Sequence, residues 1–67
     1  MKRTFDNYDA FQRWHRYNKI SVLDNILYSC NNEYAGEYEV DKKGVVIHVT
    51  ALRKHIPQRE IDYGLWS

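Results

Sequence analysis

The chain has few cysteine, proline and glycine residues. It contains one cysteine, Cys30, which rules out a disulfide within the chain, together with one proline and three glycines. No segment resembles a secretion signal, and no apolar run approaches the length of a membrane-spanning helix, so we expect a cytoplasmic protein without membrane contact. Because there is neither a linker nor an internal repeat, residues 1–67 are expected to form a single small domain.

The sequence also lacks the paired spacings of a metal site. The side chains that suit zinc are Cys30, His15, His48 and His55, and they are scattered along the chain. Structural zinc sites usually draw on closely spaced pairs of ligands. We therefore expect no metal and no other cofactor, and we assign Cys30 to packing as a buried thiol.

The net charge is small, at +1, but acidic and basic side chains are concentrated in different segments of the chain. Residues 21–41 carry five acidic side chains and no basic one, whereas basic side chains predominate on both sides of this segment. Such segregation can give a folded domain acidic and basic faces that steer its partners. Alternatively, the basic segments simply flank the acidic one and neutralise it.

Aromatic side chains are what the sequence has in abundance. Six tyrosines, two tryptophans and two phenylalanines can each bury a large area, which offsets the small core of a short chain. Homodimerisation is a second way for a chain of this size to gain stability.

Residues 33–50 have the pattern of a β-hairpin. Apolar and polar residues alternate on both sides of a polar turn that ends in glycine. If Val40 lies opposite Val45, then Tyr38 meets Ile47 on an apolar inner face that also contains Tyr34. A slip of one residue would destroy the match.

Two helices are expected before this hairpin. Asp6 can cap the first, an amphipathic helix of about three turns with an aromatic face. Ser21 and Asp24 form a capping-box pattern for the second, which would end at Asn31. Its apolar arc would contain Val22, Leu23, Ile26, Leu27 and Cys30. A single bent helix from Asp6 to Asn31 is the alternative.

These elements predict an α+β fold in which two N-terminal helices pack on a β-hairpin, followed by a short helical or irregular tail. Residues 51–56 fit either a strand or a helical turn, and Pro57 suits the start of a short helix that ends at Gly64. Because a two-stranded sheet is marginal alone, the helices must cover it, or a third strand must come from the tail or a second chain.

Catalysis has little support in the sequence. The expected register places Glu37 across from His48, a pair that could serve as acid and base. The alternative is a surface cross-strand pair of small energetic value, and no pattern indicates a cleft. We therefore expect that the protein is not an enzyme.

Nucleic-acid binding has more support. One group of basic residues lies on or beside the first helix, and another lies near the C-terminus: Arg13, Arg16 and Lys19, then Arg53, Lys54, His55 and Arg59. Arginine interleaved with aromatic rings can contact phosphates and stack on bases. The small net charge and the acidic middle of the chain argue against this function, which remains the alternative.

Protein binding is the leading hypothesis, because tyrosine, tryptophan and arginine dominate interface energetics. Trp66, near the end of the chain, could contact a partner or close the protein's own core. The residues expected to contact a partner are Arg13, Arg16, Tyr28, Arg53, Lys54, Arg59, Tyr63 and Trp66. The sequence is thus interpreted as a small non-catalytic accessory or regulatory protein, an inhibitor or adaptor of the kind that viruses, phages and mobile elements can encode.

Overall fold

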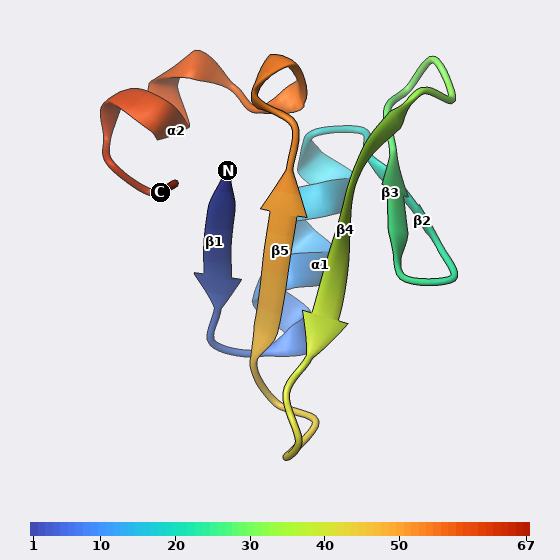
Figure 1. The fold of residues 1–67 in the computed structure, drawn as a ribbon, viewed down its shortest axis with the longest axis vertical. Coiled ribbons are helices and arrows are strands. Elements are labelled where there is room, and N and C mark those ends of the chain that lie inside the picture. Colours follow the sequence, from blue (N-terminus) through green and yellow to red (C-terminus); the bar gives the residue numbers. More distant parts are fainter.

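A five-stranded antiparallel sheet with one helix behind it makes up most of the molecule (Figure 1). The computed structural model describes residues 1–67. Along the chain the elements are β1 Lys2–Phe5, α1 Tyr8–Tyr17, β2 Ser21–Leu23, β3 Ile26–Tyr28, β4 Tyr34–Val40, β5 Ile47–Ala51, the 3₁₀ turn η1 Arg53–His55 and α2 Gln58–Asp62. The strands lie in the order β1-β5-β4-β3-β2.

The expected fold of two N-terminal helices on a hairpin is wrong, because the second helix does not exist. Its residues form the β2–β3 hairpin instead. Asp24 and Asn25 have φ angles of 52° and 66°, as a two-residue type I′ turn requires. The apolar residues therefore alternate between faces: Leu27 is fully buried, whereas Leu23 is 63% exposed.

The N-terminus supplies a strand that the sequence did not reveal. Residues 2–5, before α1, form β1, which pairs antiparallel with β5 from Lys2 opposite Thr50 to Phe5 opposite Ile47. Helix α1 then begins after Asn7, not Asp6, because the Asn7 side chain accepts a hydrogen bond of 2.8 Å from the Ala10 backbone N–H.

The β4–β5 hairpin has the expected faces but a different register. Val40 lies opposite Ile47 and Tyr38 opposite Val49, two residues from the predicted pairing. The cause is a longer turn, in which the Asp41 carboxylate accepts the backbone N–H groups of Val45 and Val46 at 2.9 and 3.1 Å. These bonds, with that of Val45 foremost, lower the pKa of Asp41 below its ordinary value of 3.8. A shift of two residues keeps Tyr38 and Val40 on the predicted face. Tyr34 does not lie on that face, because the pairing of β3 with β4 is irregular between Leu27 and Tyr28.

The core lies between α1 and the sheet face that it covers. Phe11 on α1 is fully buried, and its ring centroid lies 4.8 Å from that of Tyr38. The core consists of Phe5, Phe11, Trp14, Ile20, Leu27, Ala35, Ile47, Val49, Ala51, Ile56 and Trp66. Of the aromatic residues predicted on one face of the first helix, Phe11 and Trp14 are buried, whereas Tyr8 and Tyr17 are exposed.

The C-terminal segment returns to the N-terminus. Strand β5 ends at Ala51, η1 follows, and α2 begins directly after Pro57, so a short helix is present where one was expected. The backbone of Ser67 then exchanges hydrogen bonds of 2.8 and 2.9 Å with that of Lys2, which places the two ends of the chain side by side (Figure 1). None of the helices has the length and apolarity needed to cross a membrane.

Candidate binding surface

The sheet face opposite α1 is uncovered, and the strand pairing arranges its side chains in rows. One row crosses all five strands through Leu23, Ile26, Glu37, Thr50 and Lys2. A second row consists of Glu39, His48 and Thr4, and a third of Ser21, Tyr28 and Tyr34. The face is therefore apolar and aromatic over β2, β3 and the start of β4, and polar elsewhere.

Four side chains make up the apolar part, which we call the β2–β4 patch: Leu23, Ile26, Tyr28 and Tyr34. Leu23 is 63% exposed and Tyr34 is 48% exposed, while Ile26 and Tyr28 are half-buried. Tyr28 and Tyr34 are direct cross-strand neighbours, and so are Leu23 and Ile26. Single exposed apolar residues are common on proteins, whereas large contiguous apolar patches are typical of interaction sites.

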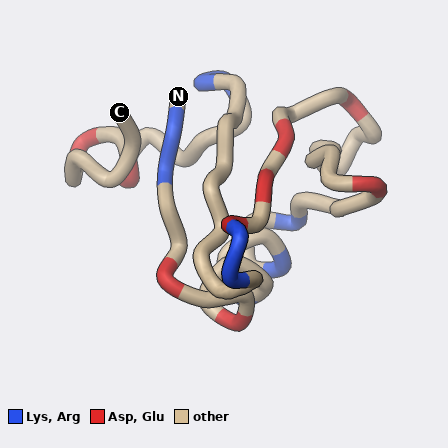
Figure 2. The backbone as a smooth tube through the Cα atoms, turned by 60° about the horizontal axis from the view of Figure 1, so that its bottom comes forward, with Lys and Arg blue, Asp and Glu red and all other residues tan.

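Carboxylates border this patch on β4. Glu37 and Glu39 are exposed on the outward side of the strand, and Glu33 precedes it (Figure 2). Glu33 forms an ion pair of 3.5 Å with Lys54 of η1, whereas Glu37 and Glu39 form no ion pair. We call these three residues the acidic border.

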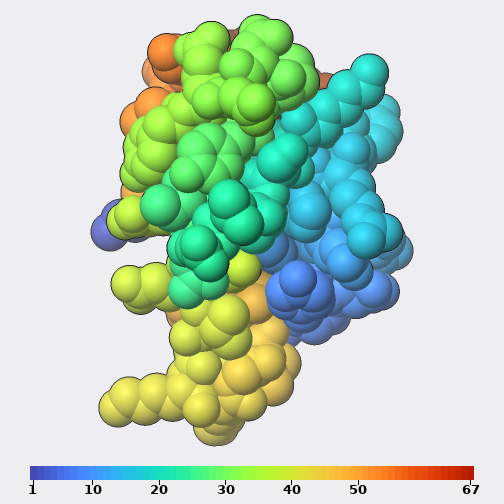
Figure 3. Space-filling model, turned by 90° about the vertical axis from the view of Figure 1, so that its right-hand side faces the viewer, coloured from blue at the N-terminus to red at the C-terminus, as the bar shows by residue number.

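The molecule's β2–β3 side leaves this region open to solvent. In the space-filling view the hairpin, coloured cyan to teal, lies uncovered next to β4 in green, and the β4–β5 turn in yellow projects below (Figure 3). A partner could therefore approach the patch from the sheet face or from the side of β2.

The pair considered for acid–base catalysis, Glu37 and His48, does not lie directly across the β4–β5 hairpin. His48 lies across from Glu39. The register expected from the sequence would have placed it across from Glu37. The Nδ1 of His48 is 3.3 Å from the Thr4 hydroxyl, and no ion pair joins His48 to Glu39. A shallow hollow of about 350 Å³ lies here, but the side chains of Thr4, His48 and Glu39 are all exposed, so the site does not exclude water.

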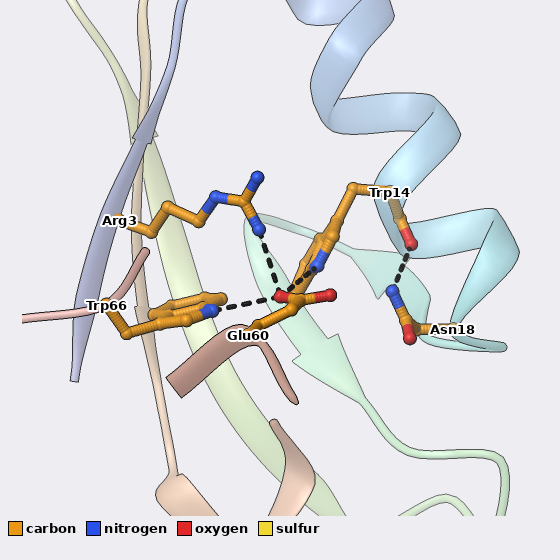
Figure 4. A network of polar contacts seen from close by, with 5 residues as sticks. All are labelled: Arg3, Trp14, Asn18, Glu60 and Trp66. Atoms are coloured by element: carbon orange, nitrogen blue, oxygen red, sulfur yellow. Dashed lines mark hydrogen bonds and ion pairs between the residues drawn. The ribbon is translucent and has the colours of Figure 1, made fainter. Parts of the chain in front are cut away.

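Trp66 is placed inside the molecule, where it closes the protein's own core. It is 6% exposed, and its indole N–H donates a hydrogen bond of 3.0 Å to Glu60 Oε1 (Figure 4). Of the two roles considered for Trp66, the structure therefore shows the internal one. Tyr63, by contrast, is 80% exposed beyond the end of α2.

The structure regroups the basic residues expected to contact a partner. Arg13 and Arg16 are exposed on α1, and the Arg59 guanidinium lies 5.7 Å from the ring of Tyr17 at the end of the same helix. Arg59 thus joins the α1 group, although in sequence it belongs with the C-terminal group. Arg53 and Lys54 lie on η1, where Lys54 is paired with Glu33.

Sequence reasoning misses part of this surface. It places Leu23 and Ile26 on the apolar arc of a helix and Tyr34 on the inner face of a hairpin, whereas all three belong to the patch. The Asp24-Asn25 pair is the one signal that could have revealed the turn. Cys30, expected to be buried, is exposed, because the segment that contains it is not a helix.

No family model, curated protein or solved structure matches the chain. Two surfaces combine features that bear on a function. One is the β2–β4 patch with its acidic border, and the other, which we call the basic flank of α1, consists of Arg13, Arg16 and Arg59 with Tyr17. The first is apolar at its centre and negatively charged at its edge, and the second carries arginines beside an exposed tyrosine. Their chemistry favours different partners.

Proposed function

We propose that this is a small non-catalytic accessory protein, an inhibitor or adaptor, that docks onto another protein through the β2–β4 patch. The observation that supports the proposal most directly is the grouping of Leu23, Ile26, Tyr28 and Tyr34 on an uncovered sheet face. Burying such a group against a partner removes apolar area from water and desolvates tyrosine rings, the type of contact that dominates interface energetics.

The acidic border defines the chemistry of the partner. Glu37 and Glu39 have no ion pair within the molecule, so their charges face the approaching surface. A protein whose apolar contact region is rimmed by lysine or arginine complements them, and attraction between opposite charges raises the rate of association. The same carboxylates repel phosphates, which makes this face unsuitable for nucleic acid.

A cytoplasmic location is part of the proposal. Cys30 is exposed and has no partner for a disulfide within the chain. Exposed free thiols persist in compartments that are kept reducing, and in oxidising compartments they are prone to oxidation or exchange.

A second candidate function is nucleic-acid binding through the basic flank of α1. The specific observation in its favour is that Arg59 lies over the exposed Tyr17 ring, with Arg13 one helical turn away. A ring and guanidinium groups placed this way can stack on a base and contact phosphates.

Affinity capture with matched tyrosine variants tests the leading proposal. The patch variant carries Tyr28→Ser and Tyr34→Ser, and the control carries Tyr17→Ser and Tyr63→Ser, which change two exposed tyrosines outside the patch. Captures are made from nuclease-treated lysate, and the affinity of any recovered protein is then measured with purified components.

Loss of the two anchoring tyrosines is expected to weaken binding at least about 30-fold, which is the effect of losing a single hot spot of about 2 kcal/mol. The control is expected to bind like the unmodified protein, and added salt should lower the association rate, because it screens the acidic border. If the patch variant binds as well as the unmodified protein, or if the control loses binding instead, the patch is not the docking surface. Thermal melts confirm that both variants are folded.

A further inference from the structure

The two edges of the sheet are protected very differently. At the β1 edge, Ser67 exchanges two backbone hydrogen bonds with Lys2. The strand also carries two charged side chains, those of Lys2 and Arg3. At the other edge, β2 has the sequence Ser21-Val22-Leu23, with no charge and no proline, and no element lies beyond it (Figure 1). Proteins usually protect an edge with charge, proline, a bulge or a covering segment, because a free edge pairs with another strand.

The turn geometry shows which backbone groups of this edge are free. In a hairpin with a two-residue turn, the residues that flank the turn, here Leu23 and Ile26, form the hydrogen-bonded pair. The next residue, Val22, then directs its N–H and C=O away from β3. Outside the ladder, Val22 takes part in no backbone hydrogen bond. The centre of the edge therefore presents one donor and one acceptor to solvent.

We infer that two copies of this protein pair through β2, antiparallel and centred on Val22. The Val22 N–H of each copy donates to the Val22 C=O of the other, so that two equivalent hydrogen bonds form about a twofold axis. In this register, each strand satisfies the free Val22 N–H and C=O of the other, so no further partner is needed. The pairing joins two five-stranded sheets edge to edge.

The charges at the ends of β2 support a second copy as the occupant of this edge. Lys19 precedes the strand and Asp24 follows it, and both are exposed. In antiparallel pairing about Val22, Lys19 of one copy lies opposite Asn25 of the other, one residue from Asp24, and the twofold axis repeats this proximity of opposite charges. A parallel arrangement would place like charges together.

Pairing of this kind would also extend the proposed docking surface. A twofold axis perpendicular to the sheet keeps both uncovered faces on the same side, and the two Leu23 side chains become diagonal neighbours on that side. The two β2–β4 patches then form one continuous surface. The pairing itself depends only on the edge and not on the proposed function, since Tyr28 and Tyr34 lie away from it on β3 and β4.

The contact is small, so a weak, reversible dimer is expected, with a dissociation constant between about 10 µM and 1 mM. Sedimentation equilibrium of the full chain measures it directly. Because the chain has 67 residues, it can be made by chemical synthesis, and a single backbone N–H can be replaced by N–CH₃. N-methylation at Val22 removes the central donor and leaves the side chain intact.

N-methylation at Val22 is expected to weaken the dimer at least about tenfold, since both central hydrogen bonds are lost and the methyl group obstructs the edge. The matched control is N-methylation at Lys43, in the exposed β4–β5 turn, whose N–H takes part in no backbone hydrogen bond. A protein that stays monomeric at about 1 mM, or a dimer that N-methylation at Val22 leaves unchanged, would overturn the inference.

A pair of charge variants gives a readout that does not depend on the modified backbone. Lys19→Glu places two repulsive contacts with Asp24 in the dimer and is expected to weaken it, whereas Lys42→Glu, the same change of charge in the β4–β5 turn, should not. Equal dimerisation of the two variants would contradict the antiparallel register. Amide NMR spectra recorded on dilution should change first at Val22 and its neighbours in β2.

Discussion

Glu60 shows how a single residue can tie together segments that are far apart in the chain. Its Oε1 atom accepts hydrogen bonds from Arg3 at 2.9 Å, from the Trp14 indole at 3.1 Å and from the Trp66 indole at 3.0 Å (Figure 4). The residue is only 8% exposed. Because the Arg3 guanidinium supplies the opposite charge, the carboxylate is buried with a partner and its desolvation is offset.

Removing this carboxylate should destabilise the whole fold. Glu60→Ala leaves two indole N–H groups without their acceptor and Arg3 without its counter-charge, and we expect it to lower the free energy of unfolding by about 3–5 kcal/mol. Glu60→Gln should be less destabilising, because an amide oxygen still accepts hydrogen bonds. Urea unfolding followed by tryptophan fluorescence reports on both rings directly.

The matched control is Glu39→Ala, which removes an exposed carboxylate from β4 and should change stability by no more than about 0.5 kcal/mol. Equal stability of Glu60→Ala and Glu39→Ala would mean that the network does not hold the C-terminal segment. No local pattern indicates this cluster, because hydrogen bonds between residues 3, 14, 60 and 66 follow from the tertiary fold and not from spacing along the chain.

At the scale of elements, the amphipathic helix was predictable and the β2–β3 hairpin was not. In α1, the aromatic residues recur with a period that only a helix places on one side, so its buried face followed from the pattern. In residues 22–27, the apolar residues fit one face of a helix, but they also lie symmetrically about a two-residue turn. The two interpretations differ only at Asp24 and Asn25, whose tolerance of positive φ decides for the hairpin.

The β4–β5 hairpin was predictable in its faces and not in its register. Alternation assigns each residue to a face, but the pairing depends on the length of the turn. The Asp41 side chain extends that turn by binding two backbone N–H groups, a contact that competes with ladder pairing and leaves no trace in the alternation. The predicted apolar face was therefore right for Tyr38, Val40 and Ile47, although each meets a different partner, and wrong for Tyr34, which the irregular β3–β4 pairing places on the other face.

Substitution of Asn25 tests the β2–β3 turn. Asn25→Val forces a β-branched residue into positive φ and should destabilise the protein by about 1–3 kcal/mol, whereas Asn25→Gly should be neutral or slightly stabilising. Asn31→Val is the control, since Asn31 is exposed and does not have positive φ. Thermal unfolding followed by circular dichroism measures all three. If the Asn25→Val variant were as stable as the control, these residues would not form this turn.

At the scale of the whole molecule, the fold sorts the charges in a way that the linear sequence only partly indicated. Of the five acidic residues in the middle of the chain, Glu33, Glu37 and Glu39 form the acidic border, while Arg13 and Arg16 lie on α1 behind the sheet. Figure 2 shows the acidic and basic segments of the backbone in red and blue. The C-terminal basic group is divided, with Arg59 beside α1 and Lys54 paired with Glu33. No single face therefore collects all the positive charge.

This division predicts weak binding to nucleic acid. A binder must neutralise several phosphates at once, and its affinity then falls steeply with salt. With its basic residues on separate surfaces, the isolated protein should bind generic duplex or single-stranded oligonucleotides little at about 150 mM salt. Fluorescence anisotropy at several salt concentrations measures this, with Arg13→Glu plus Arg16→Glu as the variant. Both side chains are exposed, so the variant should fold and melt like the unmodified protein.

The opposite result would replace the proposed function by its alternative. Binding with a micromolar or lower dissociation constant, which weakens with salt and is abolished by the double variant, would assign the basic flank of α1 to nucleic acid. In that case Tyr17→Ser should reduce binding as well, because Tyr17 is the exposed ring beside Arg59, whereas Tyr34→Ser on the other face should not. A protein that docks through the β2–β4 patch shows the reverse pattern: sensitivity at Tyr34 and none at Tyr17.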